Sequence, residues 1–295
     1  MEVTHETTLD LASIGIQSHD LESLDLPFTE NEVWATIKSL PSDKAPGPDG
    51  FTGRFYKACW PVIKHDILAA LKSDGDGRNL HLLNSVLLLL IPKKPDAIQV
   101  KDFRPICSLV HSFAKLLTKL LANRLAPKLG CLVSANQSAF IRGRCIHNNF
   151  LLVQQMARFL HRQREPRLLL KLDISKAFDS VAWPFLLKVL THLGFGVRWR
   201  DLLYSLLRSS STRVLLNGTP GDWINHRRGL RQGDLLSSML FILVMDVLNA
   251  VINKASENLL LQPLSRRNMG CQVFLYVESV VLFIHLEAPN LLATI

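Results

Sequence analysis

The sequence lacks the features of a secreted or membrane-spanning protein. Its five cysteines are widely spaced without a Cys-x-x-Cys pair, and its ten histidines show no close metal-ligand spacing, which argues against a disulfide framework and a zinc site. No run reaches the roughly 18 apolar residues that a membrane span needs. The first residues include Glu2, Glu6 and Asp10, where a signal peptide would be basic. We therefore expect an intracellular protein, nuclear or cytoplasmic, without a membrane partner.

Acidic residues are scarce after the first 50 positions. Residues 1–50 hold ten acidic residues and two lysines, and since the whole chain carries +9, residues 51–295 carry +17. Such a charge favours a polyanionic partner, most simply nucleic acid. The candidate contacts lie on one predicted helix and in a later loop: Lys115, Lys119, Arg124, Arg142 and Arg144. The alternative is that the three helix residues only form the solvated face of an amphipathic helix.

The sequence of the N-terminal half predicts an arm followed by two helices that a rigid loop connects. Residues 1–26 alternate acidic and isolated aliphatic residues without a sustained period, which indicates an arm or linker. Thr29 and Glu32 form a capping box for a helix that ends at Pro41. Pro41–Gly50 holds three prolines and two glycines, which predicts a rigid loop. A helical pattern then covers about 54–73.

Apolar periodicity predicts the remaining elements. Helices are expected over 113–125, 147–160, 198–208 and 237–254. The apolar runs 86–91 and 168–174 predict buried strands, and Ser175 is placed to cap a helix that continues to Gly194. Asn217-Gly218 predicts a turn between strands at 212–216 and 223–226, and the runs 273–276 and 280–284 predict a hairpin.

Two carboxylates stand where a metal site for nucleotidyl transfer would need them. Asp173 ends a predicted strand, and Glu278 lies in the predicted hairpin. Nucleotidyl transfer uses carboxylates that hold two divalent ions a few ångströms apart. Lys93 and Arg104 are candidates for neutralising a triphosphate. The alternative for each acid alone is a local one: a helix cap or loop hydrogen bond for Asp173, and a solvated turn for Glu278.

Six motifs occur in an order that resembles one known family. They are Lys44-Ala-Pro-Gly-Pro-Asp-Gly50, Ile91-Pro-Lys93, Asp102-Phe-Arg-Pro105, Asn136-Gln-Ser-Ala-Phe140, Lys171-Leu-Asp-Ile-Ser-Lys-Ala-Phe-Asp179 and Gly229-Leu-Arg-Gln-Gly-Asp234. From about Leu26 to Glu287 the chain resembles the reverse transcriptase domain of LINE-type (non-LTR) retrotransposons, particularly those of plants. Each motif alone is modest, and the ordered series is specific.

The resemblance implies an α+β fold, the right-hand polymerase with fingers and palm, in which 27–166 is fingers-like and 167–295 is palm. It implies Mg²⁺ or Mn²⁺ as cofactor, and an RNA template, a DNA primer and deoxynucleoside triphosphates as partners. Asp173 matches the first metal-binding aspartate. Lys93 and Arg104 match residues that grip the triphosphate.

Two further motif positions match residues around the nucleotide. Phe178 matches the aromatic residue that contacts the sugar, with core packing as the alternative. Gln232 and Gly233 match the loop that packs on nucleotide and template, and an ordinary surface loop is the alternative there, as it is for Lys93 and Arg104.

The sequence also departs from the family pattern. Where the family has Tyr-Ala-Asp-Asp, this chain has Tyr276-Val277-Glu278-Ser279, and serine supplies no anionic ligand. Leu235 stands where the family has a proline, which loosens the nucleotide loop. The chain ends sixteen residues after Ser279, where the family continues into a thumb, which we expect to be missing. The hypotheses are therefore an impaired polymerase, a non-catalytic RNA- or DNA-binding remnant, and a relic without selected function.

Overall fold

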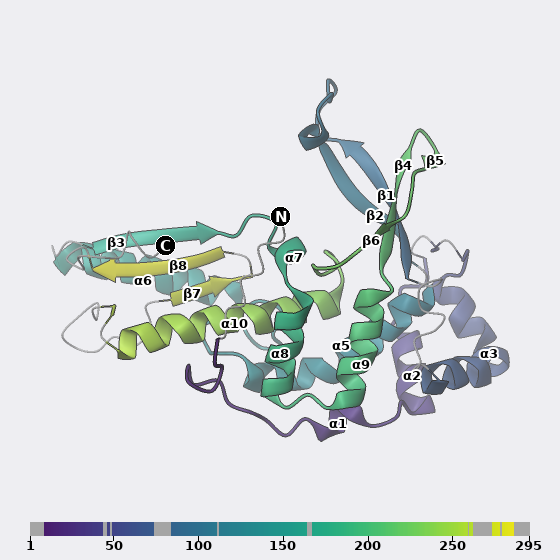
Figure 1. Cartoon of the computed structure of the whole chain (residues 1–295), viewed down its shortest axis with the longest axis horizontal. Helices are drawn as coiled ribbons and strands as arrows, with labels where there is room; N and C mark the ends of the chain where they lie inside the picture. The colour runs from purple at the N-terminus through teal and green to yellow at the C-terminus, as the bar shows by residue number, and fades with distance from the viewer. Residues whose placement is uncertain are drawn as a thin grey trace.

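The computed structural model describes residues 9–43, 46–47, 49–73, 84–110, 112–163, 167–258, 260–261, 273–277 and 279–285. It is an α+β fold with two sheets joined by a helical body (Figure 1). The expected fold class is thereby confirmed at the level of α+β. The acidic residue Glu278 lies outside the described residues.

The first sheet projects from the helical body (Figure 1). Its strands run in the order β2-β1-β4-β5, with β6 also paired to β4. β1 (Ser85–Pro92) and β2 (Phe103–Val110) form an antiparallel ribbon around the short 3-10 helix η1 (Val100–Asp102), and β1 pairs in parallel with β4 (Ser211–Leu216). The short strands β5 (Thr219–Pro220) and β6 (Ile224–Asn225) complete the sheet.

The second sheet consists of three antiparallel strands in the order β3-β8-β7. They are β3 (Arg167–Asp173), β7 (Val273–Tyr276) and β8 (Ser279–His285), which confirms the predicted hairpin. The long helix α10 (Leu235–Glu257) lies along this sheet, and α6 (Ile146–Gln163) packs against β7 (Figure 1).

The core is centred on α5 (Ser112–Leu132) and α10, which pack against each other. The leucines that recur every three or four positions on α5 are fully buried: Leu116, Leu117, Leu120, Leu121 and Leu125. α10 is long and apolar enough to span a membrane, yet 61% of its most apolar window is buried inside the protein. Its place in the core accounts for its composition.

The remaining helices surround this pair. They are α1 (Glu22–Asp25), α2 (Glu30–Lys38), α3 (Gly53–Ser73), α7 (Ala177–Ser180), α8 (Trp183–Leu193) and α9 (Val197–Arg208). The predicted helices at 54–73, 113–125, 147–160, 198–208 and 237–254 are all confirmed. So is the turn at Asn217-Gly218, whose φ angles of 48° and 83° are those of a hairpin turn with two left-handed residues.

The prediction of an arm over 1–26 is wrong for the described residues from 9 onward. Leu11, Leu21 and Leu24 are buried in the main core, and α1 packs on α9. The Asp25 carboxylate accepts hydrogen bonds from the backbone N–H groups of Arg198 and Trp199, so it caps α9. The isolated aliphatic residues lack a helical period because the segment crosses the helices as an extended strap.

Two other local predictions are wrong. The strands at 86–91 and 168–174 are not fully buried, since Ile91, Leu168 and Leu169 are each about 45% exposed. One projects with its ribbon, and the other lies at the edge of its sheet. Ser175 caps no helix. The chain turns at Lys176 with a positive φ and forms the separate helices α7 and α8, the second of which starts with Pro184 in its first turn.

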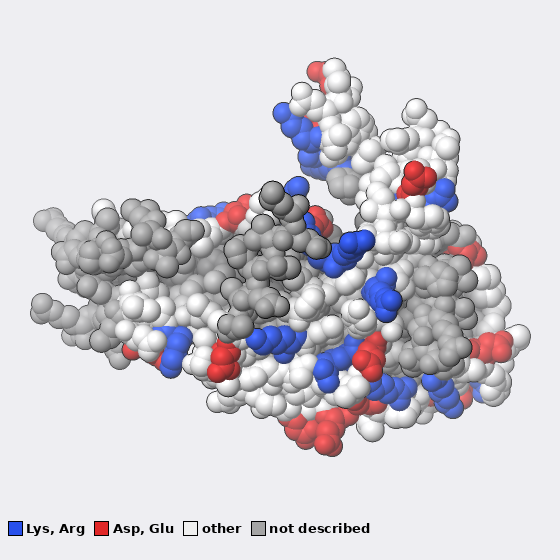
Figure 2. Space-filling view, viewed as in Figure 1, with Lys and Arg blue, Asp and Glu red and all other residues white. Residues whose placement is uncertain are grey.

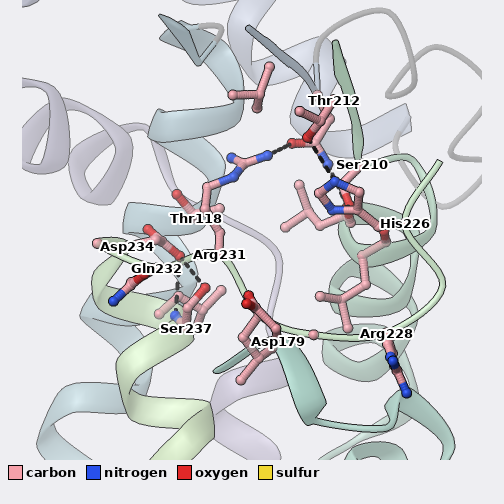
Figure 3. Close-up of a pocket in the computed structure, with 18 of the residues that line it drawn as sticks. Thr118, Asp179, Ser210, Thr212, His226, Arg228, Arg231, Gln232, Asp234 and Ser237 are labelled. Carbon is pink, nitrogen blue, oxygen red and sulfur yellow. Dashed lines mark hydrogen bonds between the residues drawn. The ribbon is translucent and has the colours of Figure 1, made fainter. Parts of the chain in front are cut away.

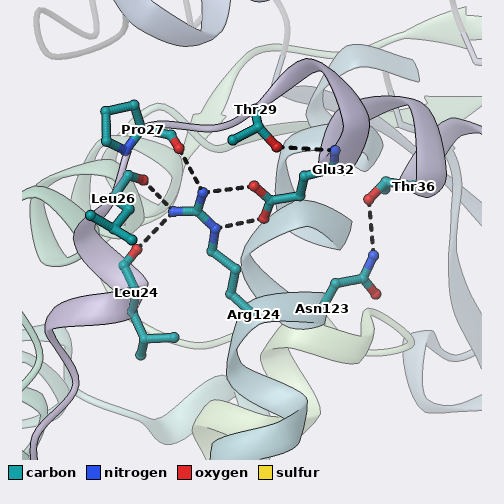
Figure 4. A network of polar contacts seen from close by, with 8 residues as sticks. All are labelled: Leu24, Leu26, Pro27, Thr29, Glu32, Thr36, Asn123 and Arg124. Atoms are coloured by element: carbon teal, nitrogen blue, oxygen red, sulfur yellow. Dashed lines mark hydrogen bonds and ion pairs between the residues drawn. The ribbon is translucent and has the colours of Figure 1, made fainter.

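Arg124 ties three segments of the chain together (Figure 4). Its guanidinium donates to both oxygens of the Glu32 carboxylate at 2.6 and 2.7 Å. It also donates to the backbone carbonyl oxygens of Leu24, Leu26 and Pro27, which fixes the N-terminal segment on α5. Half of the predicted capping box forms, because Thr29 accepts from the Glu32 N–H while the Glu32 side chain binds Arg124 instead.

The Arg124→Ala variant should lower the free energy of unfolding by about 3 kcal/mol, because it leaves the partly buried Glu32 carboxylate without its cation. Denaturant unfolding measures this. Lys254→Ala removes the exposed ion pair with Glu257 and should cost less than about 0.5 kcal/mol. An Arg124→Ala effect no larger than that of this control would contradict the assignment.

Candidate active site

Strand register places two sequence-predicted positions together at one end of the second sheet. Asp173, the last residue of β3, pairs with Ser279, the first residue of β8. The Ser279 hydroxyl donates to Asp173 Oδ1 over 3.4 Å. The turn that precedes Ser279 holds Val277 at a φ of 49°, a conformation rare for a β-branched residue. Burial raises the pKa of the neighbouring Tyr276 phenol, which packs under α6.

The donors at this point fit a pair of divalent ions poorly. Asp173 is exposed and supplies one carboxylate, while Ser279 supplies a neutral hydroxyl. The described ranges contain no group of three or more His, Cys, Asp or Glu side chains that could hold a metal ion. Two divalent ions need several anionic oxygens between them. We therefore derive no reaction step through a metal from these residues.

The predicted triphosphate residues lie at the far end of the β1/β2 ribbon. Ile91 pairs with Arg104, and the Lys93 N–H donates to the Asp102 carbonyl oxygen at 2.8 Å. Both Lys93 and Arg104 are exposed, and the Lys93 ammonium donates to the Lys101 carbonyl oxygen. The backbone N–H of Gln99, followed by the Lys94 ammonium, holds the pKa of the Asp102 carboxyl below its usual value. A triphosphate role for Lys93 and Arg104 stays a prediction.

The loop over 229–234 is tied to α7. The Gly229 N–H donates to Val181, and the Leu230 N–H donates to Phe178, each at 2.8 Å. Gly229 has a φ of 86°, and a Cβ there would lie 3.0 Å from the Asp179 backbone. Only glycine therefore fits. The predicted residues Gln232 and Gly233 follow on the exposed part of the same loop.

Phe178 is packed. Its side chain is only 9% exposed and stacks on Phe241 of α10, with ring centroids 4.5 Å apart. This is the core-packing alternative for the side chain, and a sugar contact for it remains a prediction.

Two of the five predicted nucleic-acid contacts are internal. Arg124 is occupied as described above, and the Arg144 guanidinium donates to carbonyl oxygens of Gly130, Ser134 and Gln137 at the end of α5. Both guanidinium groups are therefore engaged within the fold, and nucleic-acid contacts of Arg124 and Arg144 stay predictions. Lys119 donates to the Ser39 carbonyl oxygen, while Lys115 and Arg142 are exposed.

Comparison with known proteins decides the family. A family model described as reverse transcriptase (RNA-dependent DNA polymerase) matches residues 91–290. The chain belongs to the reverse transcriptase family. It is 29% identical to the uncharacterized 149 kDa protein of transposon TX1 from Xenopus laevis over 88% of its length. It is 30% identical, over 81% of its length, to the Pol polyprotein of the type-1 retrotransposable element R2 from Nasonia vitripennis.

A third relative is the Pol polyprotein of the type-2 retrotransposable element R2DM from Drosophila melanogaster, with 29% identity over 87% of the chain. The chain covers 20%, 22% and 25% of the lengths of these three proteins. Its sequence is that of a reverse transcriptase domain of the non-LTR retrotransposon type, which confirms the resemblance.

The Asn136-Gln-Ser-Ala-Phe140 motif of this reverse transcriptase domain builds a polar network that holds the hairpin. Asn136 Nδ2 donates to the Val273 carbonyl oxygen at 3.0 Å and to Asn249 Oδ1 at 2.7 Å. The Asn136 carbonyl oxygen accepts from the Leu275 N–H. Nearby, burial raises the pKa of Asp246 although Ser134 donates two hydrogen bonds to it. The sequence motif alone assigned no role to these residues. The adjacent amide side chains of Asn136 and Gln137 were the signal for a polar network.

A cavity of about 620 Å³ lies between the 229–234 loop, α9 and the base of the first sheet (Figure 3). His226 lines it, and both ring nitrogens contact hydroxyls, Nε2 that of Thr212 at 2.7 Å and Nδ1 that of Ser210 at 3.3 Å. Loss of water around the ring, followed by the charge of Arg231, lowers the pKa of His226. Sequence reasoning did not single out His226, because it belongs to no motif.

Leu235→Pro should raise the free energy of unfolding by about 0.4 to 1 kcal/mol. Leu235 is the first residue of α10, where proline needs no N–H partner, and Asp234 has the extended backbone that precedes proline (φ −94°, ψ 134°). Denaturant unfolding measures the change, with Leu235→Ala as the matched control. A loss of stability would show that the loop before α10 needs a different backbone.

Stability should fall as the pH is lowered from 7.5 to 5.5, in part through His226. Its folded-state pKa is lowered, so the unfolded chain takes up the proton first as the pH drops through about 6.5. In His226→Gln the fall should be smaller. Urea unfolding at both pH values measures it, and His161→Gln, at an exposed histidine, is the control. If His226→Gln lost as much stability between pH 7.5 and 5.5 as the natural chain, the lowered pKa of His226 would be contradicted.

Proposed function

We propose that the chain is the fingers and palm of an RNA-directed DNA polymerase whose catalysis is impaired at the palm hairpin. The observation that carries this proposal is the pairing of Asp173 with Ser279, where the family pattern has an aspartate. The family membership of residues 91–290 supplies the reaction class.

In this proposal the sheet β3-β8-β7 with α10 is the palm, and the ribbon β1/β2 belongs to the fingers. The first half of the chain, 27–166, is mainly fingers and 167–295 is mainly palm. Strands β4, β5 and β6 extend the sheet of β1, so we assign them to the fingers side although they follow β3 in sequence.

The substrates follow from the family, an RNA template, a DNA primer and deoxynucleoside triphosphates. Lys93 and Arg104 on the projecting ribbon would neutralise the triphosphate, and Gln232 and Gly233 on the exposed loop would face the nucleotide. Lys115 and Arg142 remain as exposed candidates for phosphate contacts. Figure 2 shows lysine and arginine side chains around the hollow between the projection and the body.

The impairment follows from charge. In two-metal nucleotidyl transfer, carboxylates hold the ions whose charge promotes attack and stabilises the leaving group, and the described residues of this chain fit such a pair poorly. The chain offers Asp173 and, outside the described residues, Glu278, whose carboxylate stands one methylene farther from the backbone than that of aspartate. Misplacement by an ångström can cost about 10²-fold in rate, and the neutral Ser279 removes a ligand altogether.

Primer extension on an RNA template tests this proposal. The compared proteins are the natural chain, Glu278→Asp/Ser279→Asp, and the same double variant with Asp173→Ala, in Mg²⁺ and then Mn²⁺. The double variant should extend the primer at least about 100-fold faster than the natural chain, and Asp173→Ala should abolish extension. Equal rates for the natural chain and the double variant would contradict the proposed impairment.

A second candidate is binding without catalysis, which the net charge of +17 on residues 51–295 favours. Binding of single-stranded RNA would then weaken linearly on a logarithmic salt scale and show little sequence preference. Salt-dependent binding together with no extension by any variant would favour this function over the first.

A further inference from the structure

The base of the β1/β2 ribbon is its buried part. Val86, the second residue of β1, is buried and packs against Ala114 of α5, whereas Ile91 and Pro92 at the other end of the strand are exposed. Figure 1 shows the ribbon leaving the helical body as a projection. The direction of the ribbon is therefore set at its base, where β1 begins beside β4.

A small tilt at this base moves the far end of the ribbon a long way. Lys93 lies nine residues after Asn84, a span of about 30 Å at about 3.3 Å per residue of extended strand. A tilt of about 2° over this length displaces Lys93, and Arg104 on the neighbouring strand, by about 1 Å. Misplacement of a reacting group by this much can cost about 10²-fold in rate.

A buried amide stands directly before β1. The side chain of Asn84 is only 2% exposed, and its Nδ2 donates to the Leu206 carbonyl oxygen and to the Ser209 hydroxyl at the C-terminal end of α9. The Asn84 backbone carbonyl oxygen accepts from the N–H of Ser211, the first residue of β4. Asn84 thus joins the start of β1 to α9 and to β4.

The side-chain oxygen of Asn84 binds a third element, the 229–234 loop. Asn84 Oδ1 accepts from Arg231 Nη2 at 2.8 Å. Hydrogen bonds from charged donors are stronger than neutral ones, and the planar guanidinium gives this one a defined direction. The contacts with α9 alone would make Asn84 a local helix cap, whereas the contact with Arg231 reaches across to the loop before α10.

The loop is itself fixed on the side of the second sheet. Trp183 Nε1 donates to the Gly229 carbonyl oxygen at 2.8 Å, in addition to the backbone hydrogen bonds that tie Gly229 and Leu230 to the α7 segment. The α7 helix begins four residues after Asp173. Hydrogen bonds therefore connect the segment that follows Asp173, through the 229–234 loop, to the base of the ribbon.

We infer that Asn84 and Arg231 are positioning residues that fix the direction of the β1/β2 ribbon relative to the 229–234 loop, and thereby the place of Lys93 and Arg104 relative to Asp173. Neither Asn84 nor Arg231 is assigned a contact with a nucleotide. The consequence for the triphosphate rests on the proposed function, whereas the direction of the ribbon does not.

Double electron–electron resonance measures the direction of the ribbon. Spin labels attached through p-acetylphenylalanine replace Ile98, between the two strands of the ribbon, and Val197, at the start of α9, which are 88% and 62% exposed. The natural chain should give one narrow distance distribution. Arg231→Met should broaden or shift it by about 5 Å, the displacement that a tilt of about 10° produces over about 30 Å. Arg231→Lys keeps a charged donor and should retain most of the natural distribution.

Two controls make this measurement specific. Arg227→Met removes an exposed arginine close to the same loop and should leave the distribution unchanged. A second pair of labels, at positions 62 and 197, spans only the helical body, because Val62 is an exposed residue of α3. The distance between this second pair should stay the same in every variant.

An unchanged distribution between positions 98 and 197 in Arg231→Met would overturn the inference. A change in both label pairs would overturn it as well, because it would show a general loss of structure in place of a changed direction. Metal, nucleotide and primer are absent from this experiment, so its result does not depend on whether the chain extends primers.

Kinetics test what the direction of the ribbon does for the reaction. In the Glu278→Asp/Ser279→Asp chain, Arg231→Met and Asn84→Leu should each raise the KM for deoxynucleoside triphosphate at least about tenfold, because both triphosphate residues are displaced. A loss of folded protein would lower kcat and leave KM unchanged. An unchanged KM would therefore contradict the positioning role. A double variant that extends no primer would count against the proposed function, while the distance measurement would still decide the direction of the ribbon.

Discussion

The antiparallel pairing of β3 with β8 is the constraint on which the account of this chain depends. It brings residues more than a hundred positions apart into register and leaves Asp173 beside Ser279. A shift of one residue would exchange the two faces of each strand, so the apolar contacts of the sheet with α10 fix the register. The Asn136 network braces β7 from the other edge, which holds the turn between β7 and β8.

The same constraint explains why the fold tolerates a serine at position 279. Ser279 stands at the end of the sheet and is only partly buried, so its side chain contributes little to the core. Two carboxylates at this point would repel each other without a metal, and a hydroxyl beside Asp173 removes that repulsion. A serine at this position therefore favours the folded state, and under the proposed function it acts against catalysis, a trade-off that is common at functional sites.

Several charged side chains bind other parts of the fold, which the net charge does not show. Two acidic residues of the N-terminal segment bind groups of the later chain. Glu32 forms an ion pair with Arg124, and Asp25 caps α9. The Lys188 ammonium and His192 contact backbone carbonyl oxygens of the same segment. Part of the basic charge on the later residues is therefore used inside the fold, and a smaller part faces outward than the net charge indicates.

The sequence allowed the family, the helices and the positions of most strands to be predicted, because periodicity, caps and turns are local signals. The α5 leucines and the Asn217-Gly218 turn are examples. The prediction that these strands are fully buried was wrong, because the exposure of Leu168 depends on which elements pack against the edge of the sheet. The internal hydrogen bonds of Arg124 and Arg144 could not be predicted for the same reason: their partners lie on segments that approach only in the folded chain. His226 shows the same limit, because its hydroxyl partners lie at the start of β4 and directly before it.

The most direct test of the central claim is the affinity of this site for Mn²⁺, measured by electron paramagnetic resonance titration of the natural chain and of Ser279→Asp. The account predicts that Ser279→Asp binds Mn²⁺ at least about tenfold more tightly, because a second carboxylate then stands beside Asp173. Adding Asp173→Ala to that variant should return the affinity to the natural level. Equal affinity of the natural chain and Ser279→Asp would contradict the placement of the two residues as partners in one metal site.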